Sequence, residues 1–426
     1  MKHKVLILGT LGEFTELVKK AKEKGYETVV CDGYADGIAR TYADKAYTIP
    51  VTDVDAIALM CREEGVDGII TSFSDLLLEC MVKIADKAGL PCYLKPEQLS
   101  WYRDKSACRD VLDKLGLPAP GFRKISVELL KQGSEEEIQQ SIANLQYPLI
   151  SKPLDKYGSR GIFIIKDQEQ LAGSVRKTAE FTDLDEILIE EYNDGFEFNM
   201  MTWVSDGAVR VISIADREKT QFAEGELPES TRNVYPSCLI DKVEEPAVSL
   251  LQSYIEYTGQ KEGPLSMQFF WKAGEGIQVC EIAARFFGYE HELTDMVYRF
   301  NMEELLLNYV YDNEYVTKML EAQDIRKPLM HGAVLYFHGR LKQIQEQQAA
   351  YELAEDKAVV KPWIFYEAGE EVVAYGPNPY LALYYIEAGR REELDEISRD
   401  FFEKMSMTDP DGEEIVFQNK IPKYSL

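Results

Sequence analysis

Short apolar runs alternate with amphipathic stretches along the first hundred residues of the chain. The runs KVLILG, ETVVCD and DGIITS have the length and composition of buried strands. The stretches between them predict helices over 13–24, over 53–64 and up to Gly89, and each ends at a glycine, the usual residue just past a helix. This alternation predicts a parallel, doubly wound sheet, so residues 1–103 are expected to form a Rossmann-like α/β domain.

From residue 104 onwards the pattern changes. A predicted helix over 104–116 is followed by the prolines of LPAPG, which end it and lead into extended chain. The predicted strands that follow are YPLISKP, GIFIIK, EILIEEY, FNMMTWVSDG, AVRVISIAD, LSMQFFW and IQVCEIAA. Strands separated by turns, with helices interspersed, predict an α+β domain over residues 104–311. Within it, 104–188 holds the first strands and 189–311 the later ones.

The last part of the chain, residues 312–426, is expected to form a smaller mixed α/β lobe. HGAVLYFHG and EEVVAY are predicted as strands, and 379–389 and 392–405 as helices. A length of 426 residues agrees with two or three domains.

Charge and hydropathy exclude several classes of partner. The 74 acidic side chains outnumber the 47 basic ones and give a net charge of -27, which repels phosphate backbones. Nucleic acid is therefore not an expected partner, although local lysines, backbone amides and a metal could still hold a small polyanion such as a nucleotide. No apolar run reaches the roughly 18 residues of a membrane span. The first strand is also too short for a signal peptide. We expect no membrane segment and a cytoplasmic protein.

The seven cysteines are scattered along the chain and form no CxxC pair. Most lie inside apolar runs such as VVCDG and LLLECMV. This distribution is typical of reduced core thiols, in contrast to a zinc site or a disulfide framework.

The first candidate for chemistry is the strand around Glu281. Side chains alternate faces along a strand, so Glu281, Ala283 and Arg285 are expected to share one face. The same alternation places Ile277 and Val279 on that face, where an apolar residue would be expected at 281. A buried acid followed by an arginine on the same face indicates a polyanion site, and a structural salt bridge at a strand end is the alternative.

A lysine at the end of an apolar strand is the second candidate. An inward-facing Lys152 is costly unless an anion meets it. Gly158 and Gly161 follow, where backbone amides can approach phosphate oxygens closely. A plain hairpin with glycine turns is the alternative.

A third candidate lies in the first domain. Gly9 and Gly12 follow the first strand and Asp32 follows the second, as in dinucleotide sites. The third glycine of that motif is absent, so ordinary turn chemistry is the alternative.

Taken in order, these motifs resemble the ATP-grasp superfamily over roughly residues 100–311. The nearest patterns are those of the biotin-carboxylase and carbamoyl-phosphate-synthase branch and of the amino-acid ligases. DKSACRDVLDKLGLPAPG is similar to the helix and exit of that branch, YPLISKPLDKYGSRGIFII to its phosphate strand and loop, and EILIEEYNDGFE to its hinge. The resemblance implies that ATP contacts Lys105, Lys152, Gly158, Gly161, backbone groups of Glu190, Glu191 and Asn193, and, through its ribose, Glu197.

The resemblance also implies a magnesium site, and this sequence departs from it. Members place an acid on one strand and E-x-N on the next, where this chain has Gln268, Glu281 and Ala283. We expect Glu281 to hold at least one Mg²⁺ together with ATP oxygens and water, and a second ion to be weak or differently held. Arg285 matches the arginine that faces the substrate carboxylate or the transferred phosphoryl group, and His291 is a further substrate-side candidate.

The activity implied by the resemblance is that of a ligase. A small carboxylate would attack the γ-phosphate of ATP, and an amine would capture the acyl phosphate with release of ADP and phosphate. Lys152 and Arg285 would be the catalytic cations. A nucleotide-binding pseudoenzyme and a nicotinamide oxidoreductase built on the first domain are the alternatives.

Substrate specificity is expected from residues 216–236, interpreted as polar and irregular, and from Ser72, Ser74 and Asp75 at first-domain strand ends. A solvated connection is the alternative for 216–236. A homodimer is common among members of the superfamily.

Overall fold

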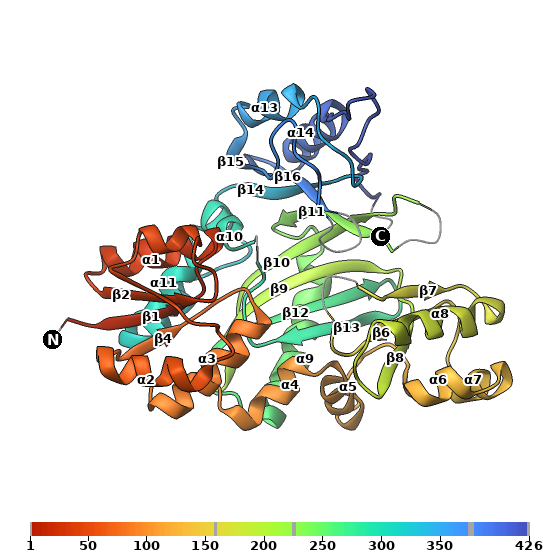
Figure 1. Cartoon of the computed structure of the whole chain (residues 1–426), viewed down its shortest axis with the longest axis horizontal. Coiled ribbons are helices and arrows are strands. Elements are labelled where there is room, and N and C mark those ends of the chain that lie inside the picture. The colour runs from red at the N-terminus through yellow and green to blue at the C-terminus, as the bar shows by residue number, and fades with distance from the viewer. Residues whose placement is uncertain (1, 157–159, 224–226, 289, 374–378, 424–426) are drawn as a thin grey trace.

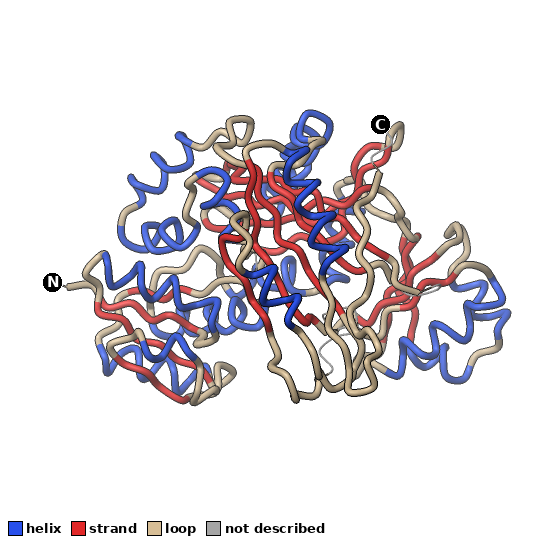
Figure 2. The backbone as a smooth tube through the Cα atoms, turned by 90° about the horizontal axis from the view of Figure 1, so that it is seen from above, coloured by secondary structure: helices blue, strands red, loops and turns tan. Residues whose placement is uncertain are grey.

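The described part of the chain contains three sheets, with helices packed around them (Figure 1). The computed structural model describes residues 2–156, 160–223, 227–288, 290–373 and 379–423. The first domain lies at one end of the molecule, a small sheet lies at the other end, and a large sheet lies between them (Figures 1 and 2). The predicted combination of a parallel α/β domain followed by antiparallel sheets with helices is confirmed.

The first domain contains a parallel sheet in the order β3-β2-β1-β4. Its strands are β1 (Lys4–Leu8), β2 (Glu27–Asp32), β3 (Lys45–Thr48) and β4 (Gly68–Ile70). Its helices are α1 (Thr15–Glu23), α2 (Val54–Glu64) and α3 (Asp75–Ala88), with the short 3-10 helices η1 (Gly12–Phe14), η2 (Ile38–Thr41) and η3 (Pro96–Gln98). Gly65 and Gly89 adopt φ values of 69° and 74°, left-handed conformations that glycine tolerates and that end α2 and α3 where the sequence predicted.

The small sheet is antiparallel and has the order β5-β8-β6-β7. Two helices, α4 (Leu99–Arg103) and α5 (Lys105–Lys114), connect the first domain to it. Its strands are β5 (Phe122–Ser126), β6 (Leu149–Pro153), β7 (Phe163–Ile165) and β8 (Glu186–Glu191). Its helices, α6 (Val127–Gln132), α7 (Glu135–Ser141) and α8 (Gln168–Glu180), share a separate apolar core with it.

The large sheet has eight antiparallel strands in the order β13-β12-β9-β10-β11-β14-β16-β15. They are β9 (Phe196–Ser205), β10 (Ala208–Thr220), β11 (Glu229–Tyr235), β12 (Gly263–Lys272), β13 (Gly276–Ala283), β14 (His331–His338), β15 (Val359–Ile364) and β16 (Tyr380–Ala388). The helices of this part are α9 (Ile240–Thr258), α10 (His291–Tyr298), α11 (Met302–Tyr311), α12 (Asn313–Ala322), α13 (Gln348–Ala354) and α14 (Arg391–Lys404).

Helix α11 returns to the first domain, where it packs against α1 and β4 (Figure 1). The hydroxyl of Tyr311 donates to Asp67 at 2.9 Å, and a Cβ built at Gly68 would lie 2.5 Å from the Tyr311 hydroxyl. The glycine at the start of β4 therefore allows α11 to approach the strand closely.

Three expectations for the later part of the chain were wrong. Residues 379–389 do not form a helix, because Tyr380–Ala388 is strand β16 between β14 and β15. Most of its side chains are buried, and such a continuous apolar run has no periodicity to separate strand from helix. EEVVAY is not a strand over its described residues, 370–373, where only an isolated bridge at Glu371 occurs. Residues 216–236 are mostly the paired strands β10 and β11, so they are neither irregular nor a solvated connection in their described part.

No helix within the described ranges is both long enough and apolar enough to cross a membrane. All seven cysteines are unpaired, and most are buried as expected.

Candidate functional site

Lys152 ends strand β6 and meets a buried carboxylate on the neighbouring strand. Its Nζ lies 2.5 Å from Glu190 Oε2 on β8, and Arg109 of α5 binds the other oxygen of the same carboxylate. Arg109 also donates from Nη2 to the Cys280 carbonyl at 2.8 Å, which joins α5 to β13. The sequence predicted an anion for Lys152, and the structure pairs this lysine with Glu190.

Burial and charge act in opposite directions on this cluster. Burial by itself raises the pKa of Glu190, but Arg109 and Lys152 lower it more, to about 2. Burial lowers the pKa of Lys152, but Glu190 raises it above the usual value. Lys152 is therefore a protonated cation with a buried partner.

The remaining phosphate-loop residues lie close to Lys152. Lys105 donates from Nζ to the Lys156 carbonyl at 3.2 Å. Gly161 has φ 73°, and a Cβ there would lie 2.6 Å from the Cβ of Phe181, so both conformation and space require glycine. Gly158 lies outside the described residues.

The hinge segment, which begins at the end of β8, is held mainly by hydrogen bonds to other parts of the chain. The backbone N–H of Glu191 donates to Gly121 at 2.9 Å, and its carboxylate accepts from the Gln146 N–H at 2.8 Å. Asn193 donates to Gln278 at 2.6 Å and accepts from the Gly195 N–H at 2.7 Å. The backbone N–H of Glu191 thus already has a hydrogen-bond partner within the chain. Adenine recognition by this segment stays a prediction.

A second buried carboxylate, Glu197, begins the corresponding cluster on the large sheet. Arg217 and Lys219, both on β10, form ion pairs with it, and Gln268 on β12 donates to it from its amide nitrogen. Burial would raise the pKa of Glu197, but Arg217 and Lys219 lower it to about 2. Gln268, predicted as a metal ligand, therefore donates a hydrogen bond from its amide to a carboxylate, and its contact with metal stays a prediction.

A β-bulge in β13 determines where Glu281 points. Val279 lies opposite Phe269 and Glu281 lies opposite Gln268, so Cys280 is the extra residue. The bulge reverses the alternation of faces, and the expected sharing of a face by Ile277, Val279 and Glu281 was wrong. Glu281 instead shares a face with Gln268, and no hydrogen-bond or ion-pair partner for its side chain occurs among the described residues.

Cys280 shows that the two carboxylate clusters are neighbours. Burial is the largest influence on its thiol and raises its pKa. Lys152 and Arg109 lower this pKa from the small-sheet side, whereas Glu197 raises it from the large-sheet side. Lys152 and Arg109 of one cluster and Glu197 of the other therefore all lie near Cys280, the residue before Glu281.

Arg285 connects the end of the β13 segment to the first domain. Its Nε and Nη2 donate to the two oxygens of Asp75, at 2.7 and 2.9 Å, and Nη1 donates to the Phe286 carbonyl at 3.2 Å. Asp75 is the first residue of α3, whose N-cap is Ser74. The structure thus joins two residues that the sequence named separately, and the contact of Arg285 with substrate stays a prediction.

The metal ligands fit one hard cation better than two. No group of three or more His, Cys, Asp or Glu side chains with metal-binding geometry occurs in the described part of the chain. Ala283 is buried and has no ligand atom. Magnesium keeps several waters and takes phosphate oxygens, so one carboxylate such as Glu281 suffices for a nucleotide-bound ion.

Sequence reasoning missed Arg109, Arg217, Lys219, Asn199 and Glu290. Arg217 and Lys219 were hidden because 216–236 was not interpreted as strands; with period-two alternation they share a face. Glu290 accepts from the Tyr235 hydroxyl at 2.5 Å and from the Asn199 amide at 2.6 Å. No local signal pointed to Arg109, because its partners come from distant strands.

The dinucleotide alternative finds no support in the first domain. The carboxylate of Asp32 accepts from the backbone N–H and hydroxyl of Thr10, at 3.0 and 3.2 Å, and so closes the glycine turn itself. A Cβ at Gly12 would lie 3.2 Å from the Trp363 ring, so a side chain already packs over this glycine. These contacts favour turn chemistry.

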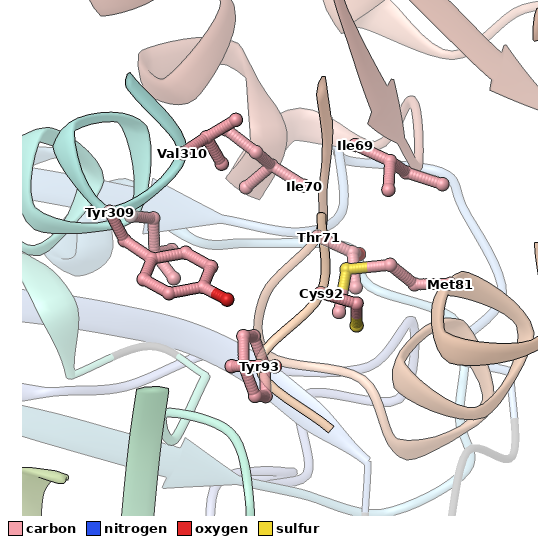
Figure 3. A pocket seen from close by; sticks show the side chains of 9 residues that line it. Ile69, Ile70, Thr71, Met81, Cys92, Tyr93, Tyr309 and Val310 are labelled. Carbon is pink, nitrogen blue, oxygen red and sulfur yellow. The ribbon is translucent and has the colours of Figure 1, made fainter. Parts of the chain in front are cut away.

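Two hollows in the described structure lie away from these residues. One is a small cavity among β4, α3 and α11, with Ile70, Tyr93 and Tyr309 in its wall (Figure 3). Its volume of about 10 Å³ holds roughly one water. A wider hollow beside α5 and β5 is lined by none of the predicted site residues.

Comparisons with known proteins agree with this geometry. Residues 145–292 match the ATP-grasp domain family. The carbamoyl phosphate synthase large chain of Clostridium perfringens is 25% identical over 274 residues, which are 63% of this chain and 24% of that protein. The formate-dependent phosphoribosylglycinamide formyltransferase of Haemophilus ducreyi is 27% identical over 169 residues, 39% of this chain and 41% of that protein. The matches thus span less than half of these relatives' own lengths.

The crystal structure of an L-amino acid ligase from Bacillus licheniformis has the same overall fold. The two superpose with a TM-score of 0.78 over 96% of this chain and 99% of that one, at 18% sequence identity. The likeness therefore extends over the first domain and the C-terminal lobe.

Proposed function

We propose that this chain, a member of the ATP-grasp superfamily, is an ATP-dependent ligase that joins a small carboxylate to an amine. A carboxylate oxygen of the substrate attacks the γ-phosphorus of ATP, the bond to the β-phosphate breaks, and ADP leaves. The amine nitrogen then attacks the acyl carbon, phosphate leaves, and the amine proton goes to solvent or a basic group. The products are an amide, ADP and phosphate.

The observation that carries this proposal is the presence of four cations on two buried carboxylates, Glu190 and Glu197, that both lie near Cys280. Lys152 and Arg109 face it from the small-sheet side, and Arg217 and Lys219 pair with the neighbouring Glu197. Phosphoryl transfer needs mainly positioning and neutralisation of oxygen charge, which such cations provide. No nucleophilic side chain is required.

The site residues have distinct roles in this proposal. Lys152 exchanges Glu190 for the α- and β-phosphates, and Lys105 and the amides near Gly161 hold the phosphate chain. Glu197 accepts the ribose hydroxyls, and Arg285 orients the acid that is activated. Glu281 would hold one Mg²⁺, which would neutralise phosphate charge when bound.

Lys152→Met tests the proposal directly. The change keeps an apolar stem but removes the charge that meets the phosphates, so ADP release should fall by about a thousandfold or more. Glu190 keeps Arg109 as its partner, so the thermal unfolding midpoint should change little. ADP release would be measured with Mg²⁺ in excess across a panel of small acids and amines.

Lys404→Met is the matched control, because Lys404 is an exposed lysine on α14 paired only with Asp400. It should leave ADP release unchanged. Full activity of the Lys152 variant with a folded chain would refute the role of the strand lysine.

A nucleotide-binding pseudoenzyme is the second candidate, favoured by Gln268 and Ala283 at positions that carry ligands elsewhere in the superfamily. It predicts heat from ATP in titration calorimetry but no ADP with any acid in the panel. The ligase predicts both signals.

A further inference from the structure

Polar side chains gather at one edge of the first-domain sheet, apart from the nucleotide residues. β1 and β4 are parallel neighbours, so the loops after them meet at the same edge. Glu13 lies in η1 after β1, and Ser72 and Asp75 follow β4. In open parallel sheets ligands bind beyond the carboxyl ends of the strands.

This edge faces the segment that follows β13. Asp75 pairs with Arg285, and the ring of Phe73 stacks on His291 with centroids 4.4 Å apart. A Cβ built at Gly288 would lie 3.5 Å from Glu13 Oε2. The three contacts place Glu13 beside the chain segment that carries Arg285.

The charged side chains around Glu13 already form ion pairs with other residues, whereas Glu13 forms none with a described residue. Arg285 has the bidentate contact with Asp75, and His291 lies between Glu303 and Glu292, at 2.5 and 3.0 Å. The Glu13 carboxylate makes no hydrogen bond or ion pair with any residue that the structure describes, although it is partly buried.

Two further observations agree with a polar ligand as the partner of Glu13. Burial is the main reason that the pKa of Glu13 lies above its usual value, because the nearby charges of His291 and Arg285 lower this pKa less than burial raises it. Ser72 Oγ, at the end of β4, is also buried and has no hydrogen-bond partner within the described ranges. Buried polar groups normally have partners, so this edge is prepared for a polar ligand.

We propose that Glu13 binds a positively charged amino group of the carboxylate substrate, so that the acid activated by this enzyme is an amino acid. The inference rests on the ligase function proposed above. The amine that attacks the acyl phosphate must be unprotonated, so a group held as an ammonium ion cannot be the nucleophile. The ammonium group therefore belongs to the acid, whose carboxylate lies toward Arg285 and the γ-phosphate.

The experiment compares amino acids with their deamino counterparts. L-leucine and 4-methylpentanoate differ only in the amino group, as do L-alanine and propionate. Excess hydroxylamine serves as a common nucleophile, because it converts any acyl phosphate into a hydroxamate that can be measured together with ADP. Wild type should use at least one amino acid about tenfold or more better, in kcat/KM, than its counterpart.

Glu13→Gln should lose about tenfold to a hundredfold in kcat/KM for that amino acid and leave the deamino acid unchanged. Its affinity for ATP, measured by calorimetry, should stay at the wild-type value. Glu23→Gln, the same change of charge at the exposed end of α1, should alter neither quantity.

Four results would overturn the inference. Wild type could use each acid and its counterpart equally, or Glu13→Gln could lose equally on both. In calorimetry without nucleotide, Mg²⁺ could also bind to the wild type and not to Glu13→Gln, which would make this position a metal-cation site. Hydroxamate from deamino acids alone defeats only this inference, whereas ATP binding with no hydroxamate from any acid defeats the ligase function itself.

Discussion

The two faces of strand β10 carry charges of opposite sign, and the fold encloses the charges of only one face. Asp216 and Glu218 point to one face, which α14 covers, and Arg217 and Lys219 point to the other. On the covered face every charge has a partner within the fold. On the open face two cations share one carboxylate, Glu197.

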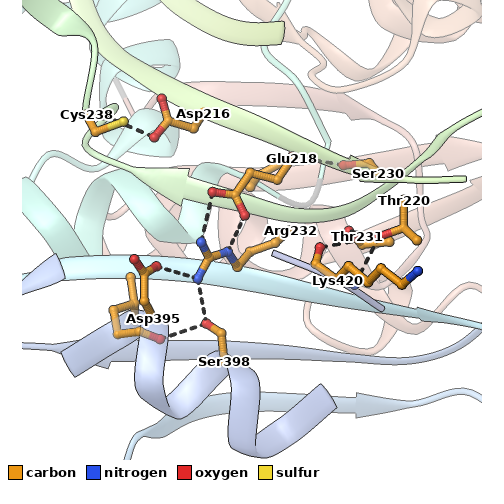
Figure 4. Close-up of polar contacts among 12 residues, drawn as sticks. Asp216, Glu218, Thr220, Ser230, Thr231, Arg232, Cys238, Asp395, Ser398 and Lys420 are labelled. Atoms are coloured by element: carbon orange, nitrogen blue, oxygen red, sulfur yellow. Dashed lines mark hydrogen bonds and ion pairs between the residues drawn. The ribbon is translucent and has the colours of Figure 1, made fainter. Parts of the chain in front are cut away.

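The covered face forms a closed network (Figure 4). Arg232 of β11 donates to both oxygens of Glu218, at 2.7 and 2.8 Å, and contacts Ser398 and Asp395 of α14 at 2.9 and 2.7 Å. Arg391 of the same helix binds Asp216 and Glu218. The Arg232 side chain is 0% exposed, so no ligand can reach it.

The open face keeps its cations accessible. The side chains of Arg217 and Lys219 are 27% and 19% exposed, whereas that of Glu197 is 2% exposed. A charged cluster on a sheet is thus structural when its partners enclose it. It is a candidate ligand site when the cations outnumber the buried carboxylates and are accessible to solvent.

The largest effect is expected from Arg232→Met. The change removes the fully enclosed guanidinium that pairs with Glu218 and Asp395 and leaves Arg391 alone to serve both carboxylates and Asp216, so the free energy of unfolding should fall by about 3–5 kcal/mol. ATP affinity of the folded fraction should not change. Chemical denaturation would measure the loss.

Arg326→Met is the matched control, since Arg326 pairs with Glu244 at the surface and should contribute at most about 1 kcal/mol. Equal losses from both changes would contradict the contrast between enclosed and exposed charge.

The buried carboxylate of Glu290 gives the next effect. Burial raises the pKa of Glu290 from 4.5 to about 7, because it outweighs the hydrogen bonds from Tyr235 and Asn199 and the charge of Arg217, which all lower this pKa. Between these pH values the folded chain keeps a proton that the unfolded chain releases. Stability from this group therefore falls as pH rises from about 4.5 to 7, by up to about 3 kcal/mol.

Glu290→Gln is neutral at every pH and should remove this slope, so it should be more stable than wild type at pH 8 and nearly equal to it at pH 5. Denaturation at several pH values measures the difference. Glu314→Gln, an exposed carboxylate on α12, serves as control. Parallel pH profiles for wild type and Glu290→Gln would show that Glu290 titrates normally.

The smallest effect is expected from Lys219→Met on the open face. Glu197 keeps Arg217 and Gln268, so the free energy of unfolding should change by less than about 1 kcal/mol. The kcat/KM for ATP should fall by about tenfold to a hundredfold, because a cation that holds Glu197, the proposed ribose-binding carboxylate, is lost. Lys219→Arg should recover much of it. A large loss of stability with unchanged kinetics would place Lys219 with the structural charges.

Local pattern was sufficient for much of the fold. Gly65 and Gly89 ended helices where expected, and the apolar runs ending at Lys152 and Glu281 are strands β6 and β13. Tyr380–Ala388 was mistaken for a helix because it is buried on both faces, a state set by the neighbouring strands and not by its own sequence.

The candidate site was predictable residue by residue, but its pairings were not. Lys152 was found because a charge at the end of an apolar run is conspicuous. Its partner Glu190 lies 38 positions later, Arg109, which binds the same carboxylate, lies 43 positions earlier, and nothing local connects the three. The face of Glu281 depends on the bulge at Cys280, which one inserted residue creates and strict alternation cannot foresee.

Helix α11 has a consequence for domain exchange between related proteins. It lies more than 200 positions after β4, yet Tyr311 bonds to Asp67 and packs over Gly68. A chimera that replaced only the first hundred residues would set a foreign β4 against the original α11, and a bulky residue at position 68 would collide with Tyr311. Any such transplant must carry both segments from the same parent.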